Sequence, residues 1–233
     1  MRRIIVALFV FGIAFGYLEA SVVVYLRALY EPLRQKISPR EANELFPLIT
    51  ADQLRDAGPE HTRRLLTEIG REAATLIMLA AIGLAAVGSF DKWAAAFLIA
   101  FGLWDIFFYV FLRVLIGWPQ SLFTWDLLFL IPVPWVGPVA APVLVSIAMI
   151  ICGLIVLQRP VAIGGAHWTG IVFGGLIIVL SFCMDSANLM RGGLPRPFHW
   201  GVFFIGLLMG LGSFAAAVWR SGSLAPQIPP DSQ

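Results

Sequence analysis

Long apolar runs constrain this sequence more than any other feature. About 20 consecutive apolar residues cross the hydrocarbon core of a bilayer as a helix. Backbone polar groups in lipid must be paired within the spanning element, and these runs lack the alternating polarity of barrel strands. We therefore expect an all-α integral membrane protein with about six transmembrane helices. The predicted spans lie near residues 4–29, 70–88, 93–117, 138–157, 165–189 and 199–219.

The composition points to the same class. Of the 233 residues, 59% are hydrophobic and 13% are charged, whereas about 25% of the residues in a soluble domain are charged. The net charge is only +2, and Lys and Arg are scattered, so nothing indicates a nucleic-acid partner. We expect one polytopic membrane domain over residues 1–220 and a disordered tail over 221–233. Its partner is the lipid bilayer, and a homo-oligomer or a membrane-complex partner is compatible with the sequence.

Six antiparallel helices would place the loops that follow the first, third and fifth spans on one side, which we call the loop face. The first of these loops, residues 30–69, is expected to be helical and extramembrane. Capping-box patterns begin at Ser38 and at Thr50, and a helical pattern runs from Glu60 into the second span. One stripe of that helix is charged, and it is either a solvated face or a polar lid over the loop face. Its members are Arg64, Glu68 and Glu72.

The segment 119–137 is apolar but interrupted by prolines. An apolar stretch too short to span is typical of an interfacial or re-entrant position, and tryptophans favour the headgroup zone. One interpretation is an interfacial elbow. The other is a re-entrant gate whose Asp126 faces a cavity.

Two spans that run in the same direction share a pattern of charged residues. Residues 15–30, FGYLEASVVVYLRALY, align with residues 101–116, FGLWDIFFYVFLRVLI. This indicates a duplicated helical hairpin, and internal repeats are common in transporters. The aligned pairs are Glu19 with Asp105 and Arg27 with Arg113. A weaker third copy would begin with the fifth span and contribute Asp185, Asn188 and Arg191.

Ionisable side chains inside a membrane are costly unless they face protein or water, so they are candidates for a functional site. If the repeated hairpins pack around an axis, these groups converge on a polar interior that opens to the loop face. The alternative is a structural network that only fixes helix register. The candidate substrate- or ion-binding residues are Glu19, Arg27, Asp105, Tyr109, Arg113, Asp126, Asp185, Asn188 and Arg191.

The repeat and the central acid are the most specific features of the sequence, and they favour a small transporter or ion-coupled carrier. The six-helix plan resembles that of many small bacterial membrane proteins, so we expect a bacterial cytoplasmic membrane, by analogy alone. The alternatives are a membrane-embedded enzyme acting on lipid or polyprenyl headgroups, and a structural or assembly subunit. No phosphate-binding loop or hydrolase motif occurs in the sequence. His61, His167 and His199 lack metal-ligand spacing, so we expect no metal and no cofactor, and we assign no catalytic residue.

Overall fold

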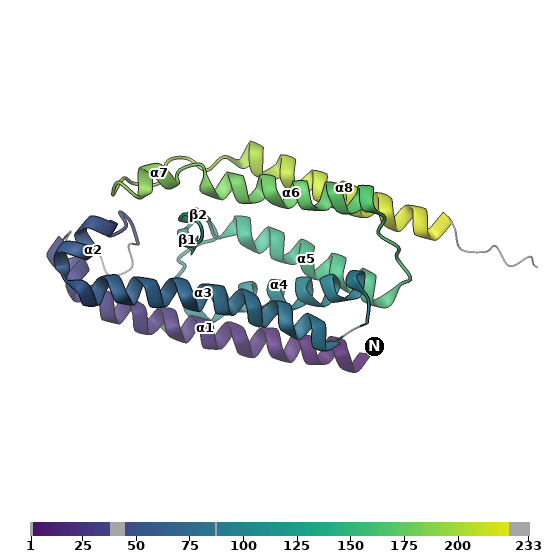
Figure 1. The fold of residues 1–233 in the computed structure, drawn as a ribbon, viewed down its shortest axis with the longest axis horizontal. Coiled ribbons are helices and arrows are strands. Elements are labelled where there is room, and N and C mark those ends of the chain that lie inside the picture. Colours follow the sequence, from purple (N-terminus) through teal and green to yellow (C-terminus); the bar gives the residue numbers. More distant parts are fainter. Residues whose placement is uncertain (1, 38–44, 87, 224–233) are drawn as a thin grey trace, which may run out of the picture.

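The structure is a computed structural model, and it describes residues 2–37, 45–86 and 88–223. Long helices lie side by side in an elongated bundle (Figure 1). The helices are α1 (Arg2–Ile37), α2 (Ala51–Ala57), α3 (Pro59–Ala86), α4 (Phe90–Ile116), α5 (Ala140–Gln158), α6 (Gly165–Cys183), α7 (Ser186–Leu189) and α8 (Trp200–Ser223). The strands are β1 (Trp125–Phe129) and β2 (Trp135–Pro138).

Five helical stretches in the described chain are long and apolar enough to cross a membrane, so the protein is a multi-pass helical membrane protein. They are α1, α4, α5, α8 and Gly165–Leu189, which contains α6 and α7. The predicted second span lies in α3, which is not among them and which carries Glu68, Arg71 and Glu72. The count of six spans and the duplicated hairpin therefore stay predictions.

The helix α4 is the centre of the larger group of helices, because α1, α3 and α5 all pack on it. Glycine allows α1 to approach α4 closely. A Cβ atom at Gly16 would lie 2.9 Å from Phe107 Cβ and 3.0 Å from the Trp104 carbonyl oxygen. Small residues are the usual means by which membrane helices bring their backbones together. The contact places Glu19, one turn beyond Gly16, against the interior of the bundle.

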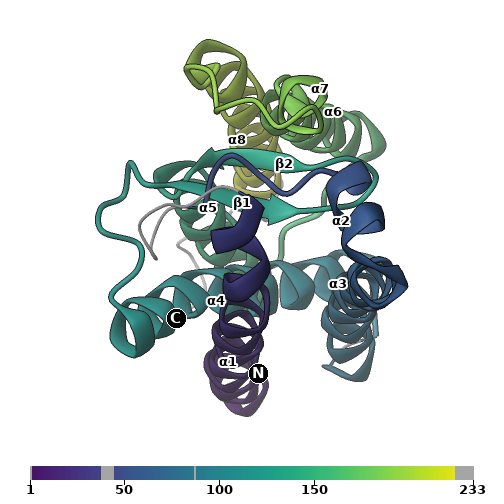
Figure 2. The same cartoon turned by 90° about the vertical axis from the view of Figure 1, so that its left-hand side faces the viewer.

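The helices α6 and α8 form a separate pair. A Cβ atom at Gly174 would lie 2.6 Å from the Gly206 carbonyl oxygen, so this pair also depends on glycine contact. Figure 2 shows the pair as a layer apart from α1, α3 and α4, with the β-hairpin and α5 between them. The pair packs on the rest of the protein through β2 and α5.

The segment 119–137 contains a β-strand and part of a second one, which the all-α prediction missed. β1 and β2 pair antiparallel, with Asp126 opposite Gly137 and Leu127 opposite Val136. Prolines at 132 and 134 exclude a continuous helix, and the extended residues on either side satisfy their backbone groups by pairing with each other. The hairpin lies at the loop-face end of the bundle, where it holds Asp126 (Figures 1 and 2).

In the first loop, α1 continues to Ile37, and α3 begins at Pro59, next to the predicted helix start at Glu60. The capping box at Thr50 is confirmed: the Gln53 N–H donates to the Thr50 hydroxyl, and the Thr50 N–H donates to the Gln53 side chain. The pattern at Ser38 lies outside the described residues. The predicted tail begins too early, since residues 221–223 extend α8, and residues 224–233 also lie outside the described residues.

Candidate functional site

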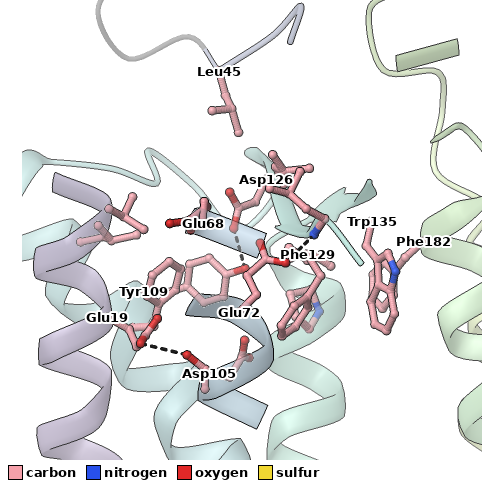
Figure 3. A pocket seen from close by; sticks show the side chains of 18 of the residues that line it. Glu19, Leu45, Glu68, Glu72, Asp105, Tyr109, Asp126, Phe129, Trp135 and Phe182 are labelled. Atoms are coloured by element: carbon pink, nitrogen blue, oxygen red, sulfur yellow. Dashed lines mark hydrogen bonds between the residues drawn. The ribbon is translucent and has the colours of Figure 1, made fainter. Parts of the chain in front are cut away.

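A cavity of about 670 Å³ lies inside the bundle and extends toward the loop face. Its walls come from α1, α3, α4, α5, α6 and the β-hairpin. Figure 3 shows its acidic side chains grouped around a common space, with Trp135 and Phe182 on the side toward α6. The acidic members are Glu19, Glu68, Glu72, Asp105 and Asp126, and the basic members are Arg27, Arg34 and Arg71.

An ionic cluster joins α1 to α3 on one wall of this cavity. Glu19 is buried, and Arg71 donates hydrogen bonds to Glu19 and to Glu68. Thr75 also donates to Glu19, at 3.1 Å. Glu68, Arg71 and Thr75 follow one another at steps of three and four residues, so they share one face of α3. A single buried carboxylate on α1 thus receives two donors from the facing helix.

A second cluster lies beneath the hairpin. The Tyr109 hydroxyl donates to Asp126 Oδ2 at 2.9 Å, which links α4 to β1. The Arg27 guanidinium lies over the Trp118 ring, 4.2 Å from its centroid, in a cation–π contact. Burial raises the pKa of Asp126 to about 6, although the hydrogen bond from Tyr109 and the positive charge of Arg27 act in the opposite direction.

The two remaining carboxylates have neutral hydrogen-bond donors. The Leu130 N–H donates to Glu72 Oε2 at 2.8 Å, and the Ser146 hydroxyl donates to Asp105 Oδ2 at 2.8 Å. Glu72 and Asp105 are 7% and 8% exposed. Both are thus held in place by hydrogen bonds that do not neutralise a negative charge.

The cavity has more acidic than basic groups. Within the described residues, ion pairs with cavity carboxylates are made by Arg71 alone, to Glu19 and Glu68. Glu72, Asp105 and Asp126 have no ion-pair partner within that part of the chain. A buried carboxylate without an ion pair is unfavourable, so it either takes up a proton or is stabilised by a nearby cation, as Asp126 is in part by Arg27. The arrangement can therefore bind protons or a positively charged ligand.

The structure brings together only part of the predicted set. Five of its members line the cavity: Glu19, Arg27, Asp105, Tyr109 and Asp126. Arg113 is exposed and donates to the carbonyl oxygens of Gly117 and Pro119 instead. Arg113 therefore does not line the cavity, whereas Arg27, with which it aligns in sequence, does.

The remaining three predicted residues lie around α7, outside the cavity. Asn188 donates to Asp185 and to the Leu194 carbonyl oxygen, and the Arg196 N–H also donates to Asp185. Arg191 donates to the Ala187 carbonyl oxygen. These contacts stabilise the turn between α6 and α8, and they do not join the acids of the cavity.

The prediction missed several polar residues of the cavity. Glu68 and Glu72 had a signal, because they belong to the charged stripe for which a polar lid was considered. Arg71 lies beside that stripe and proves to be the cation that pairs with Glu19. Ser146 and Thr75 gave no signal, since single hydroxyl groups in apolar runs are common.

No known protein identifies this site. Within the described residues, no group of three or more His, Cys, Asp or Glu side chains is arranged to hold a metal ion. Comparisons with family models, curated proteins and solved structures found no match to this chain. The function must therefore be argued from the geometry of the cavity.

Proposed function

We propose that this protein is a carrier of a bacterial cytoplasmic membrane that moves an organic cation and exchanges it for protons. The observation that carries the proposal is the set of three buried carboxyl groups without an ion-pair partner in one cavity. A cation that enters the cavity would favour their charged form and release their protons. Protons and the cation would therefore compete for the same groups, which is the requirement for exchange.

The remaining wall of the cavity suits an organic cation rather than a metal ion. Aromatic faces attract ammonium groups, and they exclude the water that a small inorganic ion would keep. Several aromatic side chains line the cavity, and they come from α4, the hairpin and α6. They include Phe97, Phe101, Trp104, Phe108, Phe129, Trp135 and Phe182.

Benzyltrimethylammonium is a suitable probe, because it is permanently charged and aromatic. We expect its addition to the purified protein in weakly buffered detergent near pH 6 to release protons. In proteoliposomes with a trapped pH dye, an inward gradient of the probe should drive protons outward. Asp105→Asn and Asp126→Asn should abolish both signals. Asp185→Asn is the matched control, since this acid lies outside the cavity, and it should behave as the wild type.

The proposal would be overturned if the wild-type protein neither binds the probe nor moves protons, while its thermal unfolding remains cooperative. A panel of aliphatic quaternary ammonium ions extends the same test to other shapes. A structural subunit would give this negative result and would instead co-purify with a partner after gentle extraction.

A membrane-embedded enzyme acting on lipid or polyprenyl headgroups is a second candidate. The observation that favours it is the Tyr109–Asp126 hydrogen bond beside the half-buried Arg27. Arg27 would bind an anionic headgroup, and Asp126 would accept a proton. Incubation of the purified protein with phospholipids or a polyprenyl phosphate would then give a product that Asp126→Asn does not form. Unchanged lipids would exclude this candidate for those substrates.

A further inference from the structure

The cavity extends to a side of the bundle where two of its walls are not packed together. α3 and α6 both contribute lining residues. Within the described chain, α3 packs mainly on α4 and α2, whereas α6 packs mainly on α8 and β2. Figures 1 and 2 both show α3 and α6 well apart, in different layers of the bundle. The region between them is therefore a candidate entrance.

Gly175 marks this entrance on α6. It lines the cavity, it is exposed, and a Cβ atom at this position would have no heavy atom within 4 Å. The preceding residue differs, because a Cβ atom at Gly174 would meet the backbone of α8. Gly175 therefore borders open space that is continuous with the cavity. It lies near the middle of α6, so the space outside it is at the depth of the lipid acyl chains.

The part of the cavity farther from the loop face is apolar. Phe97 and Phe101 precede Asp105 by two turns and one turn on α4, and Met149 follows Ser146 by about one turn on α5. Because α4 and α5 run in opposite directions, all three residues lie on the side of the acids away from the loop face (Figure 1). A ligand there would contact apolar surface while its charge reached Asp105.

We propose that the cation enters from the bilayer between α3 and α6, and that it is a membrane-dissolved amphiphile. Its apolar part would rest on Phe97, Phe101 and Met149, and its positive group would move to the buried carboxylates. The inference that the ligand is a cation rests on the proposed function. The position of the entrance is inferred separately, from the open space at Gly175. The inference thus adds a substrate class and a route to the carrier.

The entrance can be tested without measuring transport. In a Cys152→Ala, Cys183→Ala background, Met149→Cys places one thiol inside the cavity. We expect a long-chain alkyl maleimide dissolved in the bilayer of proteoliposomes to label it. Adding Gly175→Trp should slow this labelling about tenfold, because the indole would fill the open space. Gly212→Trp is the matched control and should leave the rate unchanged, since Gly212 also has open space but lies on α8 outside the cavity.

A cysteine at a second position is a control for correct folding and for the amount of alkyl maleimide in the bilayer. Val10 on α1 is 63% exposed, so Val10→Cys should react with the alkyl maleimide at the same rate in both tryptophan variants. The inference is overturned if Gly175→Trp and Gly212→Trp give equal labelling of Met149→Cys. It is also overturned if only a membrane-impermeant maleimide, supplied from water, labels that thiol.

The outcomes separate the two proposals. If labelling depends on position 175 but benzyltrimethylammonium releases no protons, the entrance stands and the carrier proposal fails. If the probe releases protons but labelling does not depend on position 175, the carrier stands and its ligand enters from water.

Discussion

The group of α1, α3 and α4 and the pair of α6 and α8 are held together differently. In the first group, glycine contact along α1 is combined with buried ionic and hydrogen-bonding groups. In the second, Gly174 packs against the backbone of Gly206 and Gly210, and apolar side chains face outward. Apolar helices can associate in lipid by close packing alone, so the buried charges of the first group are not needed for packing. Close packing therefore does not account for those charges, and the carrier proposed above assigns them to a ligand.

The largest effect is expected from a bulky residue at the α1–α4 contact. Gly16→Leu would push α1 away from α4, because the backbone of Trp104 and Phe108 leaves no room for a side chain. We expect a loss of at least about 3 kcal/mol in stability together with loss of cation binding. The loss of stability is measured by thermal unfolding in detergent. A thiol-reactive dye reports unfolding by labelling Cys152 and Cys183 as they become exposed.

The corresponding change in the other pair sharpens the comparison. Gly174→Leu should destabilise the α6–α8 contact by a similar amount while the α1–α3 ionic cluster remains. Gly201→Leu is the control for both, since a Cβ atom there has open space. Equal tolerance of leucine at positions 16, 174 and 201 would contradict the close contacts.

The second effect concerns the ionic link between α1 and α3. Glu19→Gln would leave Arg71 with one fewer carboxylate in a mostly buried position, at an expected cost of about 2 kcal/mol. The triple variant Glu19→Gln, Glu68→Gln, Arg71→Met should recover part of that loss, because no charge of this cluster is left without its partner. Asp185→Asn should cost under about 1 kcal/mol, since its partner Arg196 is 73% exposed. Denaturant unfolding in mixed micelles compares the three variants.

The third effect is a dependence of stability on pH. Burial raises the pKa of Asp126 to about 6, so the folded protein binds this proton more tightly than the unfolded chain does. The resulting stabilisation is complete below about pH 4 and is lost as the pH rises through about 6, with a size of about 3 kcal/mol. Asp126→Asn should reduce the fall in melting temperature between pH 4 and pH 8 without abolishing it, because burial also raises the pKa of Glu68 to about 7. A wild-type melting temperature that rises across this window would contradict the buried, unpaired state of Asp126.

The smallest effect distinguishes the two aligned arginines. Arg27→Ala removes a buried cation–π contact with Trp118 and should cost about 1 kcal/mol. Arg113→Ala should cost about 0.5 kcal/mol or less, because this side chain is exposed. It should also leave proton release by benzyltrimethylammonium unchanged. If Arg27→Ala and Arg113→Ala change proton release equally, the result would favour a binding site built from both copies of the predicted repeat over the cavity described above.

The sequence predicted the membrane class because apolar run length is a direct consequence of bilayer thickness. It also singled out Glu19 and Asp105, since carboxylates deep in apolar runs need an enclosed position. It could not separate Arg27 from Arg113. The two arginines occupy equivalent positions in the aligned segments. Their environments differ because Arg27 lies over the Trp118 ring, whereas Arg113 donates to the carbonyl oxygen of Gly117 at the end of its own helix.

The hairpin and the ionic partners required information that local patterns do not contain. Short apolar runs between prolines are compatible with several conformations, and the pairing of β1 with β2 became evident only from the tertiary structure. Arg71 lies on a helix face that resembles an ordinary solvated one in sequence. Its role depends on Glu19, which is 52 positions away in the chain. Long-range contacts of this kind are set by helix packing rather than by the local sequence.

The glycine contact between α1 and α4 also has a consequence for membranes of different thickness. Gly12 and Gly16 stand one turn apart against Leu103 and Trp104, so α1 cannot slide along α4 without a steric clash. A thicker or thinner bilayer is accommodated by tilting of helices, and these two would tilt as one rigid unit. The relative depth of Glu19 and Asp105 is therefore insulated from hydrophobic mismatch.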